Sequence, residues 1–308
     1  MKKSPVLLLT VLAVVLLGMV ILWSNHRPGS STTVEVTTEK PDLPVPEVSA
    51  SYPQGARLEP LEGQDDRADS IRIRFERAND LHAYVNELAA KANAGDADAA
   101  WMISRVYDYC GPYSANPAGY SRDTETLVAT SSATATSLTA HRAKVASRCA
   151  RFSPQDDLSS GTLMRVQQAA AKAGSLPAEA SLLAARQPLS TEPGYENALV
   201  ERVRSSRDPE AYLALSVAMG PVASEKEWDI KGLYGVPNAD IAWQLAACQA
   251  GLDCGPRSAL MTMYCANGGI CSTDPNQDFR TFVFDAAVPR QSADRLNEMV
   301  RSILPSGR

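Results

Sequence analysis

The chain has 308 residues, of which 44% are hydrophobic and 6% aromatic, and its formal net charge is −5. This length suffices for one or two domains with a hydrophobic core. Abundant alanine with few aromatic residues favours close-packed helices over a β-sandwich, because alanine is the strongest helix former. The acidic charge argues against a nucleic-acid-binding protein, which usually has a basic face. Three histidines leave little for metal or acid–base chemistry.

The N-terminus has the pattern of a membrane-targeting segment. Two lysines precede an uncharged, mostly apolar run over residues 5–23. A helix of that length spans roughly 28 Å, close to the hydrocarbon thickness of a bilayer. We predict that residues 1–23 form a single-pass transmembrane anchor in a bacterial inner membrane, with the C-terminal domain in the periplasm. The alternative is a long signal sequence, cleaved to leave a soluble periplasmic protein.

Residues 24–69 have the composition of a linker. Pro, Ser, Thr and Glu dominate this segment, and no apolar periodicity persists in it. Such a segment cannot bury enough apolar surface to offset its ordering entropy, so we expect it to be disordered. As a flexible coil it spans roughly 35–40 Å. It therefore separates the membrane from residues 70–304, the predicted folded domain.

Helical periodicity begins at the start of this domain. Apolar residues at spacings of four, three and four predict one face of a helix over residues 81–92. Gly95 breaks this helix, and a second helix is expected to stop at Cys110-Gly111-Pro112. A turn-rich loop is expected to follow, as far as Arg122. Residues 124–152 then predict one or two helices rich in Ala, Ser and Thr.

The second half of the domain continues as helix pairs. Pro177 and Pro209 each fall in an expected first helical turn, where the missing N–H costs nothing. A loop is expected over residues 221–237, and a short segment begins at Asp274-Pro275. The last helix is predicted over residues 292–304. Its inward-facing residues are predicted to be Leu296, Met299, Val300 and Ile303.

A repeated pattern runs through these helix pairs. The pattern is a small residue, a glycine three positions later, a small residue four further on, and an apolar residue four beyond that, and one of its four copies lacks the glycine. The glycine is expected to end the first helix in a left-handed conformation, and the small residues let two helices approach closely. Repeats that cannot bury their faces alone stack into a solenoid. The copies are Ala92, Gly95, Ala99, Ile103; Ala171, Gly174, Ala178, Leu182; Arg207 in the glycine position with Asp208, Ala211 and Leu215; and Cys248, Gly251, Gly255, Ala259.

Two stretches of these repeats carry a family motif. One consists of Gly235, Val236, Ala242, Trp243, Ala247 and Gly251, and the other of Ala99, Ile103, Ser104 and Tyr107. With these residues the chain resembles the Sel-one-like branch of the tetratricopeptide superfamily, over about residues 81–110 and 163–271. The resemblance implies an all-α fold, a short α-solenoid of antiparallel helix pairs that holds other proteins on its concave face. A fold alone does not fix a function.

Six cysteines in an exported protein predict disulfides before metal ligands. If residues 257–266 are helical, Cys254 and Cys265 lie roughly 15 Å apart, whereas a disulfide needs Cα atoms within about 7 Å. A zinc site is the alternative for the four clustered cysteines. However, five, ten and five residues intervene between successive cysteines, and zinc sites usually have roughly two to four. The predicted pairs are Cys110–Cys149, Cys248–Cys254 and Cys265–Cys271.

Trp228 and Tyr234 are the candidate partner-binding residues. They share one loop, where Trp228 either packs within the loop or anchors a partner protein. We predict no catalytic, cofactor-binding or metal-binding residues. His82 and His141 have no partner at a telling spacing, and the chain has neither a nucleophile-elbow motif nor a phosphate-binding glycine loop.

Together these patterns predict a membrane-anchored periplasmic helical-repeat protein that binds or scaffolds protein partners in the cell envelope. An envelope hydrolase with a site that follows no motif is one alternative, and a structural subunit of an envelope assembly is another. A concave groove lined by Asn, Arg and aromatic residues would indicate partner binding. A deep pocket with His82 or His141 beside an acid would indicate a hydrolase. We expect the protein to bind no cofactor, metal or nucleic acid. We favour a protein without enzymatic activity over an enzyme.

Overall fold

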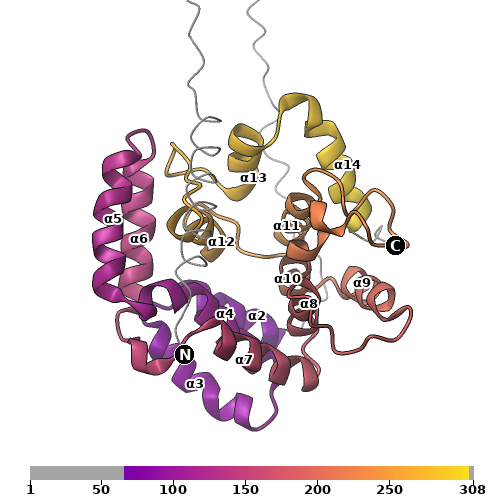
Figure 1. Cartoon of the computed structure of the whole chain (residues 1–308), viewed down its shortest axis with the longest axis horizontal. Helices are drawn as coiled ribbons and strands as arrows, with labels where there is room; N and C mark the ends of the chain where they lie inside the picture. The colour runs from indigo at the N-terminus through magenta and orange to yellow at the C-terminus, as the bar shows by residue number, and fades with distance from the viewer. Residues whose placement is uncertain (1–65, 305–308) are drawn as a thin grey trace, which may run out of the picture. The chain divides into compact units, whose positions relative to one another are not determined.

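The computed structural model describes residues 66–304, and every regular element in that range is a helix (Figure 1). The predicted anchor over residues 1–23 and nearly all of the predicted linker over residues 24–69 lie outside the described range. Within that range, no helix combines the length and the apolar character needed to cross a bilayer. The predicted all-α class is confirmed for this part of the chain.

The first helices begin where short polar side chains cap them. Asp80, Asp96 and Asn116 each accept a hydrogen bond from the backbone N–H three residues later, which satisfies one of the free donors of a helix start. These caps fix the starts of three consecutive helices. The helices of this half are α2 (Asp66–Arg77), α3 (Leu81–Asn93), α4 (Ala97–Ala115), α5 (Pro117–Thr130) and α6 (Ala135–Cys149).

Helix α4 continues past Pro112, so the prediction that Cys110-Gly111-Pro112 ends it was wrong. Proline removes one helical hydrogen bond, but Pro112 is exposed, and the buried Cys110 and Ser114 hold the helix on either side of it. The predicted loop as far as Arg122 was also wrong. Asn116 caps α5 directly, with Pro117 in its first turn.

The helix pairs predicted for the second half of the domain are present in the structure. Ser159, Ser175 and Asp208 cap three of these helices, α7, α8 and α10, and Pro177 and Pro209 lie in first turns as predicted. The last two short helices before the C-terminal one each continue into a π-helical turn, over Met263–Asn267 and Val283–Ala287. The helices are α7 (Ser160–Lys172), α8 (Leu176–Ala184), α9 (Tyr195–Ser206), α10 (Pro209–Met219), α11 (Ala239–Gln249), α12 (Ala259–Thr262), α13 (Phe279–Phe282) and α14 (Ala293–Ile303).

The repeat positions have the backbone conformation that the pattern predicts. Gly95, Gly174 and Gly251 have φ values of 91°, 102° and 109°, and Arg207, which replaces the glycine of the third copy, has a φ of 57°. Each ends a helix in the left-handed region, so the chain reverses at equivalent points. The small and apolar residues that follow are buried, apart from the half-buried Gly255: they are Ala99, Ile103, Ala178, Leu182, Ala211, Leu215 and Ala259.

These helices pack in a series: α3 on α4, α4 on α7, α7 on α8, α8 on α10, α10 on α11, and α11 on α14. Trp243 on α11 is fully buried, and its Nε1 donates to the Leu233 carbonyl at 2.8 Å. The four residues predicted to face inward on α14 are all buried. Helices α5 and α6 lie side by side as a separate pair (Figure 1), packed on α4 and on the π-helical turn of residues 263–267.

All three predicted disulfides are present, with Cα–Cα distances of 5.6 Å for Cys110–Cys149, 5.7 Å for Cys248–Cys254 and 4.3 Å for Cys265–Cys271. The first joins α4 to α6, and the other two each tie a helix end to the loop after it. The four clustered cysteines are bonded in pairs, so they are not thiolate ligands of a zinc ion. Three disulfides indicate an oxidising, extracytoplasmic compartment.

Candidate functional site

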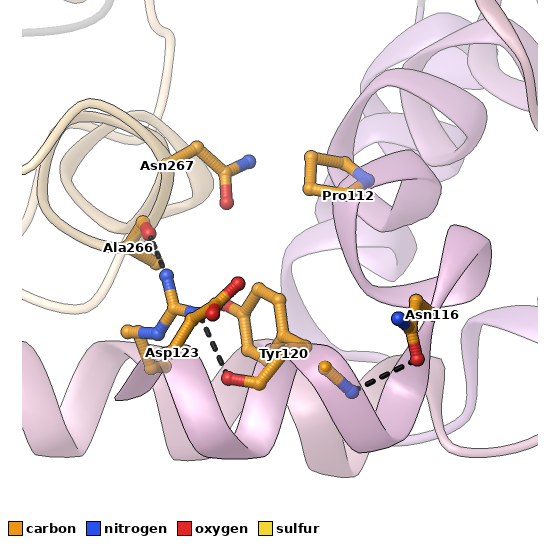
Figure 2. A pocket seen from close by; sticks show the side chains of 8 residues that line it. Pro112, Asn116, Tyr120, Asp123, Ala266 and Asn267 are labelled. Atoms are coloured by element: carbon orange, nitrogen blue, oxygen red, sulfur yellow. Dashed lines mark hydrogen bonds between the residues drawn. The ribbon is translucent and has the colours of Figure 1, made fainter. Parts of the chain in front are cut away.

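A groove opens where the α5–α6 pair meets the π-helical turn of residues 263–267. Its volume is about 230 Å³. Figure 2 shows Asn267 and Pro112 on opposite sides of the opening, with Tyr120 and Asp123 between them at the base. The groove is lined by Pro112, Asn116, Gly119, Tyr120, Asp123, Arg142, Ala266 and Asn267.

Arg142 on α6 holds the walls of the groove together. Its side chain is 6% exposed, and each guanidinium nitrogen donates a hydrogen bond. Nε donates to Thr124 Oγ1 at 2.6 Å, Nη1 to the Ala266 carbonyl at 2.9 Å, and Nη2 to the Tyr120 carbonyl at 2.9 Å. A planar guanidinium with donors in fixed directions suits this bridging of three segments. One side chain therefore fixes α5 and the π-helical turn relative to α6.

Tyr120 supplies the aromatic surface of the groove. The Arg142 guanidinium carbon lies 3.7 Å from its ring centroid, and the Tyr113 ring meets it edge-on at 5.5 Å. A cation at that distance over an aromatic face is attracted by the negative π surface. Burial raises the pKa of Tyr120 to about 12, so its phenol stays protonated at neutral pH. The side chain is 6% exposed and the Arg142 guanidinium covers its ring, and a phenol with this raised pKa is unsuited to act as a base.

The rim of the groove presents amides and one carboxylate to solvent. Asn116, Asp123 and Asn267 are all exposed. The Asn116 Oδ1 accepts from the Gly119 N–H at 2.9 Å, and a Cβ on residue 119 would lie 2.5 Å from the Asn116 amide nitrogen. Glycine at that position therefore lets the amide lie flat against α5. Amides both donate and accept hydrogen bonds, as an extended peptide backbone requires.

A second cavity of about 320 Å³ contains one of the predicted binding residues. It lies between the loop after α8, the start of α9 and the loop before α11, and Trp228 lines it. The Trp228 side chain is 4% exposed, and its Nε1 donates to Glu196 Oε2 at 3.0 Å. Its ring centroid lies 5.0 Å from that of Tyr234, whose hydroxyl donates to the Lys226 carbonyl at 2.8 Å. The two rings thus pack on each other, Trp228 also contacts α9 through Glu196, and the role of the pair in partner binding stays a prediction.

Neither of these two cavities is lined by a histidine. The His82 ring lies 5.1 Å from that of Phe152, in an edge-on contact. His141 Nδ1 lies 3.2 Å from Thr262 Oγ1, and burial lowers the pKa of His141. This ring therefore links α6 to α12 as a neutral imidazole at physiological pH.

Comparison with protein-family models, with curated proteins and with solved structures found no match to this chain. The groove itself was missed by sequence reasoning. Its residues come from three separated stretches, and Arg142 gave no signal because it lies in a segment rich in Ser, Thr and Ala. The Asn116-Pro117 pair is a typical helix start and could have placed the beginning of α5, but this stretch was predicted to be a loop.

Proposed function

We propose that the chain is a membrane-anchored periplasmic helical-repeat protein that binds or scaffolds protein partners in the cell envelope, with the groove as its binding site. The observation that carries this proposal is the groove's lining. Asparagine amides, an arginine and a tyrosine surround an open cavity, which is the composition expected for partner recognition. The exposed rim residues Asn116, Asp123 and Asn267 offer hydrogen-bond donors and acceptors to a peptide backbone.

The framework around the groove supports the same function. Arg142 and the Cys110–Cys149 and Cys265–Cys271 disulfides fix both walls before a partner arrives. A rigid site loses less conformational entropy on binding than a mobile one. The repeated helix pairs agree with a Sel-one-like α-solenoid, which we propose as the arrangement. Residues 5–23 would hold this domain at the periplasmic face of the inner membrane, unless they are cleaved as a signal sequence.

The proposal is tested by crosslinking and pull-down of the full-length protein from membranes. The wild type is compared with the double variant Asp123→Ala/Asn267→Ala, which strips two polar groups from the rim. Asn93→Ala is the matched control, because Asn93 is an exposed asparagine at the end of α3. We expect the wild type and the control to recover the same specific protein, and the double variant to lose it. Recovery of no specific partner, with turnover of a cell-wall substrate instead, would overturn the proposal.

A further inference from the structure

One wall of the groove belongs to a segment that charged side chains hold at both ends. This segment, residues 258–267, comprises α12 and the π-helical turn, and is called the wall segment below. Glu76 on α2 accepts a hydrogen bond from the Ala259 N–H at 2.8 Å, at the segment's start. Arg142 donates to the Ala266 carbonyl at 2.9 Å, near its end. A carboxyl group at the first N–H groups and a cation at the last carbonyls both complement the dipole of a helical segment.

Two further polar contacts attach the wall segment to α6. His141 Nδ1 lies 3.2 Å from the buried Thr262 Oγ1, and Lys144 Nζ donates to the Arg257 carbonyl just before the segment. The segment is thus tied to α6 by His141, Arg142 and Lys144, whereas Glu76 ties it to α2. Both helices are far from the segment in sequence, so non-covalent contacts such as these hold it to them. Undocking of the segment from α2 therefore breaks the hydrogen bond between Glu76 and the Ala259 N–H.

Glu76 lies in a cluster of charged and titratable groups that come from every element packed around it. Helix α4 contributes Arg105 and Tyr109, α6 contributes Lys144 and Arg148, and the loop before α12 contributes Asp253. Burial raises the pKa of Glu76 from 4.5 to about 7, and Asp253 raises it further, whereas the Ala259 N–H, Arg105 and Arg148 lower it. Removal from water therefore outweighs the attraction of the arginines.

We propose that Glu76 is a proton-dependent latch on the groove, and that loss of its proton loosens the wall segment from α2. This inference rests on the proposed function in one respect, namely that a partner binds in the groove. The latch itself concerns only the docking of residues 258–267 onto α2. A protonated Glu76 carboxyl still accepts the Ala259 N–H through its carbonyl oxygen, and it does so without burying a charge. An ionised carboxylate gains hydration when the segment opens.

The direction follows from proton linkage. The docked form holds the Glu76 proton more tightly than an open form in which the carboxyl regains its ordinary pKa of 4.5. Opening becomes easier as the pH rises from that value through about 7. Between pH 6 and pH 8 the equilibrium constant for opening should rise about tenfold. The wall segment would stay docked in a mildly acidic periplasm and would open more often in an alkaline one.

Hydrogen exchange read by mass spectrometry tests the latch on the full-length protein in detergent. The protection factor of the wall segment, which is the intrinsic exchange rate divided by the observed rate at the same pH, is measured from pH 6 to pH 8. The variants are Glu76→Gln and, as a control, Glu87→Gln, an exposed glutamate on α3. We expect this protection factor to fall about tenfold in the wild type and in Glu87→Gln, and to stay level in Glu76→Gln.

A level protection factor in the wild type, or an equal fall in Glu76→Gln, would overturn the latch. If Glu76→Gln does not fold, a level protection factor in the wild type still overturns it. The assay contains no partner protein. A failed latch therefore leaves the proposed binding function standing, and a failed pull-down leaves the latch standing.

Discussion

Removal of the Cys110–Cys149 disulfide should cost the domain more stability than removal of either short-range disulfide. The two cysteines are 39 positions apart, whereas each of the other two pairs is separated by 6 positions. In the chain-entropy model a disulfide stabilises by restricting the unfolded chain, and the effect grows with the logarithm of the closed loop. The long loop then contributes about 4 kcal/mol and each short loop about 2 kcal/mol.

The test compares Cys110→Ala/Cys149→Ala with Cys265→Ala/Cys271→Ala, so that two sulfur atoms are lost in each variant. Unfolding in urea without reductant, followed by circular dichroism, gives the free energy of unfolding by linear extrapolation. We expect the first variant to lose about 2 kcal/mol more than the second. An equal or smaller loss in the first variant would show that Cys110–Cys149 does not stabilise through loop closure, and that α4 and α6 are held together by packing alone.

Three further predictions concern single side chains. Gly235→Ala should lower the free energy of unfolding by about 2 kcal/mol more than Gly232→Ala. Both glycines have a positive φ, but only a Cβ on residue 235 would meet a neighbour, lying 2.7 Å from Ser224 Cα. Equal losses in urea unfolding would contradict this prediction. Arg148→Met should destabilise by about 3 kcal/mol, because the buried Phe75 carbonyl and the partly buried Ala78 carbonyl lose their donor. A loss under about 1 kcal/mol would show that water replaces the guanidinium. The free energy of unfolding of the wild type, relative to that of Glu76→Gln, should fall by about 2.5 kcal/mol from pH 5 to pH 8. The reason is that the pKa of Glu76 is raised in the folded protein, so stability is lost as this carboxyl ionises. If urea unfolding gives the same difference between the two proteins at every pH, the raised pKa of Glu76 is refuted.

Much of the helical framework follows from local signals in the sequence. The left-handed helix ends at Gly95, Gly174 and Gly251, the prolines of the first turns and the buried face of α14 are all short-range features, and their physics acts within a few residues. The disulfide pairs also follow, because helix geometry separates Cys254 from Cys265 and leaves local partners.

The groove does not follow from the sequence, because its geometry depends on contacts between distant segments. Arg142 meets the Ala266 carbonyl 124 positions away, and Glu76 meets the Ala259 N–H 183 positions away. Pro112 shows a related limit of local reasoning. Its ring predicts a helix end, but tertiary packing of the residues on either side offsets the single lost hydrogen bond.

The central claim is that the groove binds a protein segment, and site-specific photocrosslinking tests it most directly. A photoreactive amino acid is placed in the full-length protein at position 123 or 267 in the groove, or at position 93 on α3 as the control, and irradiated in intact cells. We predict the same discrete protein adduct from positions 123 and 267, and none from position 93. Adducts that are absent from the groove positions, or identical at all three, would contradict the claim.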